Sequence, residues 1–224
     1  MRKVASLLVG SAAALSLAAA QSRSIGGGAG WFSIGYTVLS GHNALRDALR
    51  ANGLSVPASP SGIIVGGGGG GYLSRIFLGG YGEAIIGGDL GGGYGLFRLG
   101  YLWRLGSRLV ILPTVGIGGG RYGFTVSNRP EEVSFVQAID PAGGIPPRTL
   151  STSGIIGGLG LSLQYFSAKG PMVGLELGYS RGLGGFEDWG AAGVDLRNGP
   201  EITPTQLYVR LLVGGGAISS GEGE

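Results

Sequence analysis

The chain has 224 residues, enough for one substantial domain, and carries 43% hydrophobic residues, 13% charged residues and 51 glycines. This apolar content excludes a disordered glycine-rich linker, which is poor in hydrophobic residues, and the low charge is atypical of a soluble surface, where about 25% of residues are charged. The chain contains no cysteine, so an exported domain of this composition depends on a large core or a closed sheet instead of disulfides.

The first twenty residues predict a secretory signal peptide. Arg2 and Lys3 form a short basic start, an apolar stretch runs from Val4 to Leu17, and three alanines precede Gln21. Cleavage there gives a mature chain that begins at Gln21 and lowers the net charge of +3 by two. A buried first helix is the alternative. Export and the small mature charge both argue against a nucleic-acid partner.

Beyond Gln21 the sequence alternates between apolar and small or polar residues, with the period of two that is typical of β-strands. No uninterrupted apolar run of about 18 residues follows, so no transmembrane helix is expected. One face of each segment is apolar, and the other carries glycine, serine and the charges. The predicted strands are Gly28–Leu39, Gly62–Tyr72, Ile76–Gly87, Gly91–Trp103, Arg108–Thr125, Ser153–Phe166, Met172–Leu183 and Thr205–Gly216.

A short amphipathic helix is predicted at His42–Asn52, with Leu45 and Leu49 on one face. Such a helix would cap the mouth of a barrel or lie on the membrane surface. His42 is the sole histidine, and no motif joins it to a serine, so an N-cap or exposed role is expected instead of catalysis. One imidazole and no cysteine leave too few ligands for zinc, so neither a metal site nor a cofactor is expected.

Six consecutive glycines, Gly66 to Gly71, lie in the second predicted strand. GxGxxG patterns arise by chance in so glycine-rich a chain, and no lysine followed by serine or threonine ends a glycine run, so a nucleotide-binding loop is not indicated. The wall of a narrow barrel uses glycine for curvature and for room beside large inward side chains. We interpret the run as a sharply coiled piece of barrel wall.

The connections mostly alternate in length along the chain, with one exception, the short link at Gly88–Leu90. Those at 73–75, 104–107 and 167–171 are tight, whereas those at 40–61, 126–152 and 184–204 are long. An even number of strands with short turns at one end and long loops at the other is typical of outer-membrane barrels. The sequence therefore predicts an all-β chain, an eight-stranded antiparallel up-and-down transmembrane β-barrel over residues 21–218. A disordered tail is expected at 219–224.

In this architecture the chain resembles the small eight-stranded outer-membrane barrels of the OmpA/OmpX-like type, from about Gly26 to Ile218. The resemblance implies that the chain lies in the bacterial outer membrane, with both termini and the tight turns in the periplasm. No specific motif adds to this likeness of architecture.

Four charged residues are predicted at mid-strand on the inward face, namely Glu83, Arg98, Glu176 and Arg210, with Tyr208 beside them. Strand register counted from the middle of loop 184–204 places Glu176 almost opposite Arg210. Glu83 and Arg98 are expected to lie diagonally across the hairpin between the third and fourth strands. Buried charges need partners, so we expect a polar network that plugs the interior. A polar conduction path is the alternative.

Two further groups are placed by the ends of the predicted strands. An interfacial aromatic girdle is expected near the tight turns, at Tyr72, Phe77, Tyr101, Trp103 and Tyr165. An acidic rim is expected on the outer loops, and it includes Asp140, Glu187, Asp188 and Asp195. This rim is either simply solvated or a surface that binds divalent cations and bridges to lipopolysaccharide.

The function expected from the sequence is that of a monomeric, non-enzymatic integral outer-membrane barrel. Its role would be structural or would depend on surface interactions through the loops, with membrane lipid, lipopolysaccharide or a surface ligand as partners. Two alternatives remain. One is an outer-membrane lipid-modifying enzyme that uses His42, and the other is a soluble exported barrel that binds an apolar ligand.

Overall fold

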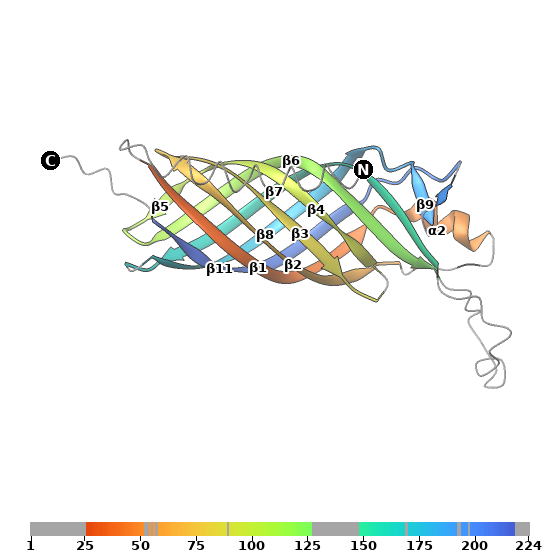
Figure 1. The fold of residues 1–224 in the computed structure, drawn as a ribbon, viewed down its shortest axis with the longest axis horizontal. Coiled ribbons are helices and arrows are strands. Elements are labelled where there is room, and N and C mark those ends of the chain that lie inside the picture. The colour runs from red at the N-terminus through yellow and green to blue at the C-terminus, as the bar shows by residue number, and fades with distance from the viewer. Residues whose placement is uncertain are drawn as a thin grey trace, which may run out of the picture.

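The computed structural model describes residues 26–51, 54, 56, 58–88, 90–126, 148–168, 170–191, 194–196 and 198–217. Eight long strands form one closed antiparallel barrel (Figure 1), because each pairs with two others and the first long strand in the chain pairs with the last. The predicted eight-stranded all-β barrel is confirmed. The strands are β1 (Gly26–Ser40), β2 (Ser61–Leu73), β3 (Ile76–Ile86), β4 (Leu90–Tyr101), β6 (Leu109–Val126), β7 (Arg148–Phe166), β8 (Pro171–Gly184) and β11 (Thr205–Ala217). The predicted signal peptide and C-terminal tail lie outside the described residues.

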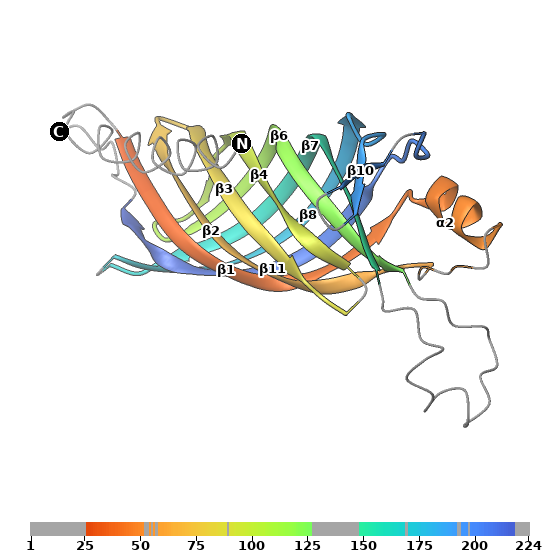
Figure 2. The same ribbon diagram turned by 45° about the vertical axis from the view of Figure 1, so that its right-hand side comes forward.

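Four short elements complete the fold. The helix α2 (Asn43–Arg50) follows β1, and β5 (Trp103–Leu105) continues beyond β4 to pair with β6. The short strands β9 (Trp189–Ala191) and β10 (Val194–Leu196) pair with each other, and β9 also pairs with the start of β7. Figures 1 and 2 show α2 and the β9–β10 pair at one end of the barrel, which we call the long-loop end. The opposite end, beside β5, is the short-turn end.

The sequence did not predict β9 or β10, and it placed the start of β7 at Ser153 instead of Arg148. The early part of β7 extends at the long-loop end beside the end of β6 and supports β9. In the described part of the chain, no helix is long and apolar enough to span a membrane.

Side chains on the barrel wall alternate between an apolar exterior and a polar interior. Leu159, Leu161 and Leu163 of β7 are 58%, 50% and 46% exposed, whereas Glu176 and Arg210 are each 1% exposed. An apolar exterior around a polar interior is the arrangement of a barrel in lipid. It is the reverse of the soluble alternative, in which the Leu and Val faces would point inward.

The six-glycine run is a regular part of β2. Its residues, 66–71, pair without interruption with both β1 and β3, and none of the six has a positive φ. The run is therefore a piece of the barrel wall, as the sequence predicted, and its inward glycines provide space. A Cβ atom at Gly68 would lie 2.7 Å from Cβ of Tyr81, and one at Gly70 would lie 2.6 Å from Cζ of Phe77.

The interior is filled in three layers. An apolar cluster at the long-loop end includes Leu45 and Leu49 of α2, so the helix caps the barrel mouth. A second apolar cluster fills the short-turn end around Trp31 and Phe77. Buried polar and charged side chains lie between the two clusters. The interior of an eight-stranded barrel is only wide enough for side chains to fill, and these layers fill it.

Candidate functional site

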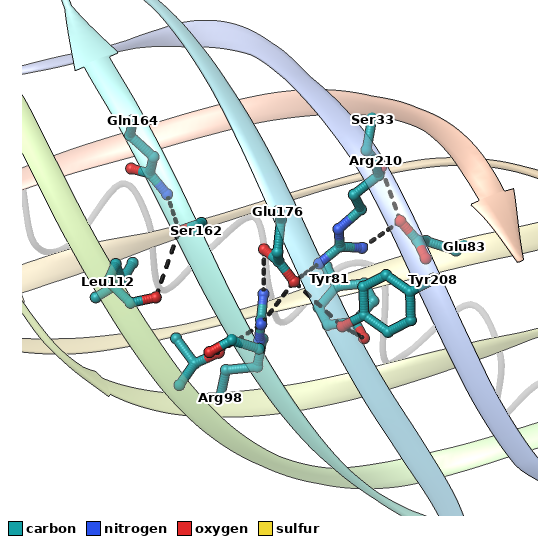
Figure 3. A network of polar contacts seen from close by, with 12 residues as sticks. Ser33, Tyr81, Glu83, Arg98, Leu112, Ser162, Gln164, Glu176, Tyr208 and Arg210 are labelled. Carbon is teal, nitrogen blue, oxygen red and sulfur yellow. Dashed lines mark hydrogen bonds and ion pairs between the residues drawn. The ribbon is translucent and has the colours of Figure 1, made fainter.

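The middle layer of the interior contains a chain of four charges that alternate in sign (Figure 3). Glu83 on β3 pairs with Arg210 on β11, Arg210 pairs with Glu176 on β8, and Glu176 pairs with Arg98 on β4. Four strands contribute one charge each, and all four residues are at most 6% exposed. The layer as a whole is electrically neutral, which is the condition under which charges can be buried at moderate cost.

Glu176 is the centre of this network. It accepts hydrogen bonds from Arg98 Nη1 to Oε2 at 3.0 Å and from Arg98 Nη2 to Oε1 at 2.8 Å, which is bidentate pairing. Arg210 Nη2 and the Tyr208 hydroxyl also donate to Oε1, at 2.7 and 3.1 Å. The strand register places Arg210 directly opposite Glu176, at the position counted from the loop midpoint.

Glu83 lies opposite Tyr94 and Arg98 lies opposite Gly79, so the two charges are diagonal across the hairpin but do not pair with each other. Arg98 pairs with Glu176 and donates to the Thr114 hydroxyl, whereas Glu83 accepts from Arg210, from Ser33 Oγ at 2.9 Å and from the Tyr94 hydroxyl at 2.7 Å. The physical reason is barrel closure. Closure lets side chains from β4 and β8 meet across the interior, so they need not pair with a neighbour on the same hairpin.

Aromatic rings support the arginines. The Tyr81 ring lies under both guanidinium groups, with its centroid 4.0 Å from Cζ of Arg210 and 4.9 Å from Cζ of Arg98. Arg210 also lies over the Tyr208 ring at 5.1 Å. Desolvated cation–π contacts of this kind stabilise buried cations. They hold both guanidinium groups in the middle of the barrel, away from water.

Sequence reasoning missed four members of this network: Ser33, Tyr81, Tyr94 and Thr114 as hydrogen-bonding or ring partners. The alternation of side chains along each strand indicated their inward position, since these residues share the inward face with the charges. The inward–outward alternation along a strand does not show which strands face each other across the interior.

The predicted aromatic girdle is only partly correct. Tyr101, Trp103 and Tyr165 are 41%, 53% and 42% exposed and face outward near the short turns. Tyr72 and Phe77 do not belong to the girdle, because they are 2% and 1% exposed and pack against each other inside the barrel at a ring distance of 5.4 Å. Their position near a turn suggested a girdle, but their parity directs them inward.

Arginines from the short turns contact two girdle residues. Arg75 Nη1 donates to the Tyr101 hydroxyl at 3.3 Å, and Arg108 Nη1 donates to the Tyr165 hydroxyl at 3.4 Å. The hydrogen bond from Arg75 to Tyr101 raises the pKa of Arg75 above its ordinary value. Amphipathic rings and cations at this level are the usual anchors of a barrel in the membrane interface.

The acidic rim occupies the opposite end. Glu187 and Asp188 lie just before β9, Asp195 lies on β10, and all three are exposed. Asp140 lies outside the described residues. Among the described residues, no group of three or more His, Cys, Asp or Glu side chains is arranged to hold a metal ion.

His42 lies at the N-cap position of α2, but its side chain makes no capping hydrogen bond. The residue is 1% exposed and its ring stacks on Phe124 with centroids 5.6 Å apart. Phe124 in turn packs against Trp189 of β9 at 6.1 Å. His42 is therefore part of the apolar cap, and an exposed histidine at a lipid-facing site is not what the fold provides.

No protein-family model matches this chain, and no curated protein matches it. Among solved structures, Neisserial surface protein A is similar over 83% of this chain and 96% of its own, with a TM-score of 0.51 and 8% sequence identity. The fold is that of a small outer-membrane β-barrel. The outer-membrane location expected from the sequence agrees with this fold and with the apolar exterior.

Two other solved structures are similar at lower TM-scores. The attachment invasion locus protein Ail of Yersinia pestis is similar over 85% of this chain and 99% of its own, with a TM-score of 0.41 and 14% identity. The N-terminal β-barrel domain of Pseudomonas aeruginosa OprF covers 84% of this chain and 98% of its own, with a TM-score of 0.39 and 12% identity.

Proposed function

We propose that this barrel does not conduct and that it serves to hold a rigid interaction surface at its long-loop end, which faces the cell exterior. One observation carries the proposal. The interior is closed by two apolar clusters with a neutral ion-paired layer between them. A small barrel filled in this way leaves its loops and rims as the surfaces that can meet a partner.

The elements added beyond the barrel support this role. The helix α2 and the strand β9 both contribute side chains to the apolar cap, through Leu45, Leu49 and Trp189. Trp189 also donates from Nε1 to the carbonyl oxygen of Pro200 at 2.7 Å, which fixes the chain between β10 and β11. The described part of the long-loop end is thus packed, and such preorganisation lowers the entropic cost of binding.

The charge of this surface indicates its partner. Glu187, Asp188 and Asp195 are exposed on or beside the short strands β9 and β10, whereas the helix α2 exposes both Asp47 and Arg50. An acidic surface suits a cationic ligand, or lipopolysaccharide phosphates bridged by divalent cations. We take the bridged lipopolysaccharide as the partner, with the barrel as a monomer and without enzymatic activity.

Conductance tests the closed interior. The protein refolded into a planar bilayer should show no steady channel current, and Arg98→Ala should not open one while the two apolar clusters remain. Steady single-channel steps from the wild-type protein would contradict the proposal.

Retention on lipopolysaccharide vesicles tests the acidic surface. The triple variant Glu187→Gln, Asp188→Asn, Asp195→Asn should lose Mg²⁺-dependent retention, and chelation of Mg²⁺ should have the same effect on the wild type. The matched control is Arg75→Gln with Arg108→Gln, at the other end of the barrel. Retention that is independent of Mg²⁺ would exclude the bridged mode.

A further inference from the structure

The lipid-facing wall of the barrel contains a hollow of about 590 Å³ that crosses β4, β6, β7 and β8. Its lining is almost entirely apolar, with one charged residue, Arg181. Ligand sites typically have volumes of about 300–1,000 Å³, apolar walls and a few placed polar groups. This hollow falls in that range of volume, but it is an open groove in the lipid-facing wall and not an enclosed pocket.

Strand register explains how the hollow is built. Phe97, Ile117, Gly157 and Arg181 are consecutive partners across the four strands and form one row. Gly157 is the only member of the row without a side chain. The adjacent row continues the apolar wall with Leu159 opposite Tyr179. The missing side chain at Gly157 therefore leaves room directly beside Arg181, which the side chain of Leu183 partly covers.

The row runs obliquely through the membrane. Phe97 lies near Tyr101, the short-turn end of β4, whereas Arg181 lies near Gly184, the long-loop end of β8. A groove that follows this row leads from the apolar middle of the wall to a cation at the outer boundary. A lipid matches this order, because its acyl chain is apolar and its phosphate group lies at the membrane interface.

Arg181 is available for an anion. The side chain is exposed, and among the described residues its guanidinium forms neither an ion pair nor a hydrogen bond. Glu201 lines an adjoining hollow with Arg181 but does not reach ion-pair distance. Arg121, the outward arginine on β6, differs because its Nη2 donates to Ser151 Oγ at 2.6 Å.

We propose that this groove binds one phosphate-bearing lipid of the outer leaflet, with an acyl chain along the row from Gly157 to Phe97 and the phosphate on Arg181. A guanidinium pairs with phosphate in a bidentate fashion. An outward arginine near the membrane boundary is also relieved of the cost of facing lipid when a phosphate meets it. This site needs no Mg²⁺, so binding in the presence of chelator distinguishes it from the acidic surface.

Two variants and two matched controls test the proposal in zwitterionic micelles. Arg181→Gln removes the cation, and Gly157→Leu fills the groove, since a Cβ atom there meets only the flexible Leu183 side chain at 3.1 Å. The controls are Arg121→Gln and Gly82→Leu. Gly82 is an exposed glycine of β3, where a Cβ atom meets only the carbonyl oxygen of Tyr94 at 3.9 Å.

Native mass spectrometry with added lipid A, in the presence of chelator, gives the readout. The wild type should retain one lipid A, Arg181→Gln should weaken retention at least about tenfold, as expected for loss of a charge-assisted hydrogen bond, and Gly157→Leu should abolish it. The controls should stay within about twofold of the wild type. If Gly157→Leu does not refold, the retention of lipid A by Arg181→Gln is compared with that by Arg121→Gln, and this comparison alone tests the proposal.

Three results would overturn the proposal. The first is that the wild type retains no lipid A. The second is that dephosphorylated lipid A binds as well as lipid A, because Arg181 would then have no role. The third is that both controls weaken retention as much as the two test variants do, which would mean that lipid coats the whole wall without a site.

Discussion

Replacement of Glu176 by glutamine should be among the most destabilising changes in the barrel. The substitution keeps the shape of the side chain but removes the carboxylate that pairs with both Arg98 and Arg210. Arg98 then has no ion pair, and the buried layer keeps two cations and only Glu83 as an anion. Breaking a buried ion pair costs about 3–5 kcal/mol, and the loss of two contacts puts Glu176→Gln near the upper end, about 5 kcal/mol.

Removal of the opposite partner should cost less. In Arg210→Met, Glu176 keeps Arg98, and Glu83 keeps hydrogen bonds from Ser33 and Tyr94, so we expect about 3 kcal/mol. The double variant retains Arg98 and Glu83, and the interior is neutral again. Its free energy of unfolding should therefore fall by at least about 2 kcal/mol less than the sum of the two single losses.

The measurement is urea unfolding in lipid vesicles, followed by the fluorescence of the three tryptophans. Arg121→Gln is the exposed-arginine control and should cost less than about 1 kcal/mol. Strictly additive losses would show that Glu176 and Arg210 do not interact in the folded protein. That result would refute the register that places them opposite each other.

Two further substitutions test the packing of the interior. Gly178→Ala should prevent refolding or strongly destabilise the barrel, because a Cβ atom there would collide with the ring of Tyr208. The control Gly82→Ala should refold like the wild type. The band shift of unheated samples in gel electrophoresis measures the folded fraction of both variants, and equal refolding would show that Gly178 is not needed for space. His42→Ala should lower the free energy of unfolding by about 1–3 kcal/mol, because the packing of His42 on Phe124 is lost. The same variant should leave membrane lipid composition unchanged. A changed lipid composition would support the enzyme alternative.

The strands could be predicted from the sequence because a membrane barrel repeats one rule along its whole length. Each strand has an apolar outward face, and the short turns follow every second strand, so the eight segments and their order are evident before any contact is known. The local pairing of Glu176 with Arg210 also follows from counting, because one loop joins their strands and fixes the register.

The partners across the interior could not be predicted in this way. Arg98 meets Glu176, far from its own hairpin, because the barrel is closed and narrow. The same limit explains Tyr72 and Phe77, whose position near a turn suggested the girdle although their parity points inward. It also explains β9 and β10, since a three-residue strand has too little periodicity to be recognised in a loop.

The glycines of the inner wall imply a pattern of joint variation in related sequences. Two inward glycines lie under the far end of one large side chain, Gly178 under the ring of Tyr208 and Gly160 under the guanidinium group of Arg98. A larger residue at the glycine position is acceptable only when its neighbour becomes smaller. Related barrels should therefore exchange size between such partners and keep the summed volume of each pair nearly constant, while the outward glycine Gly82 varies independently.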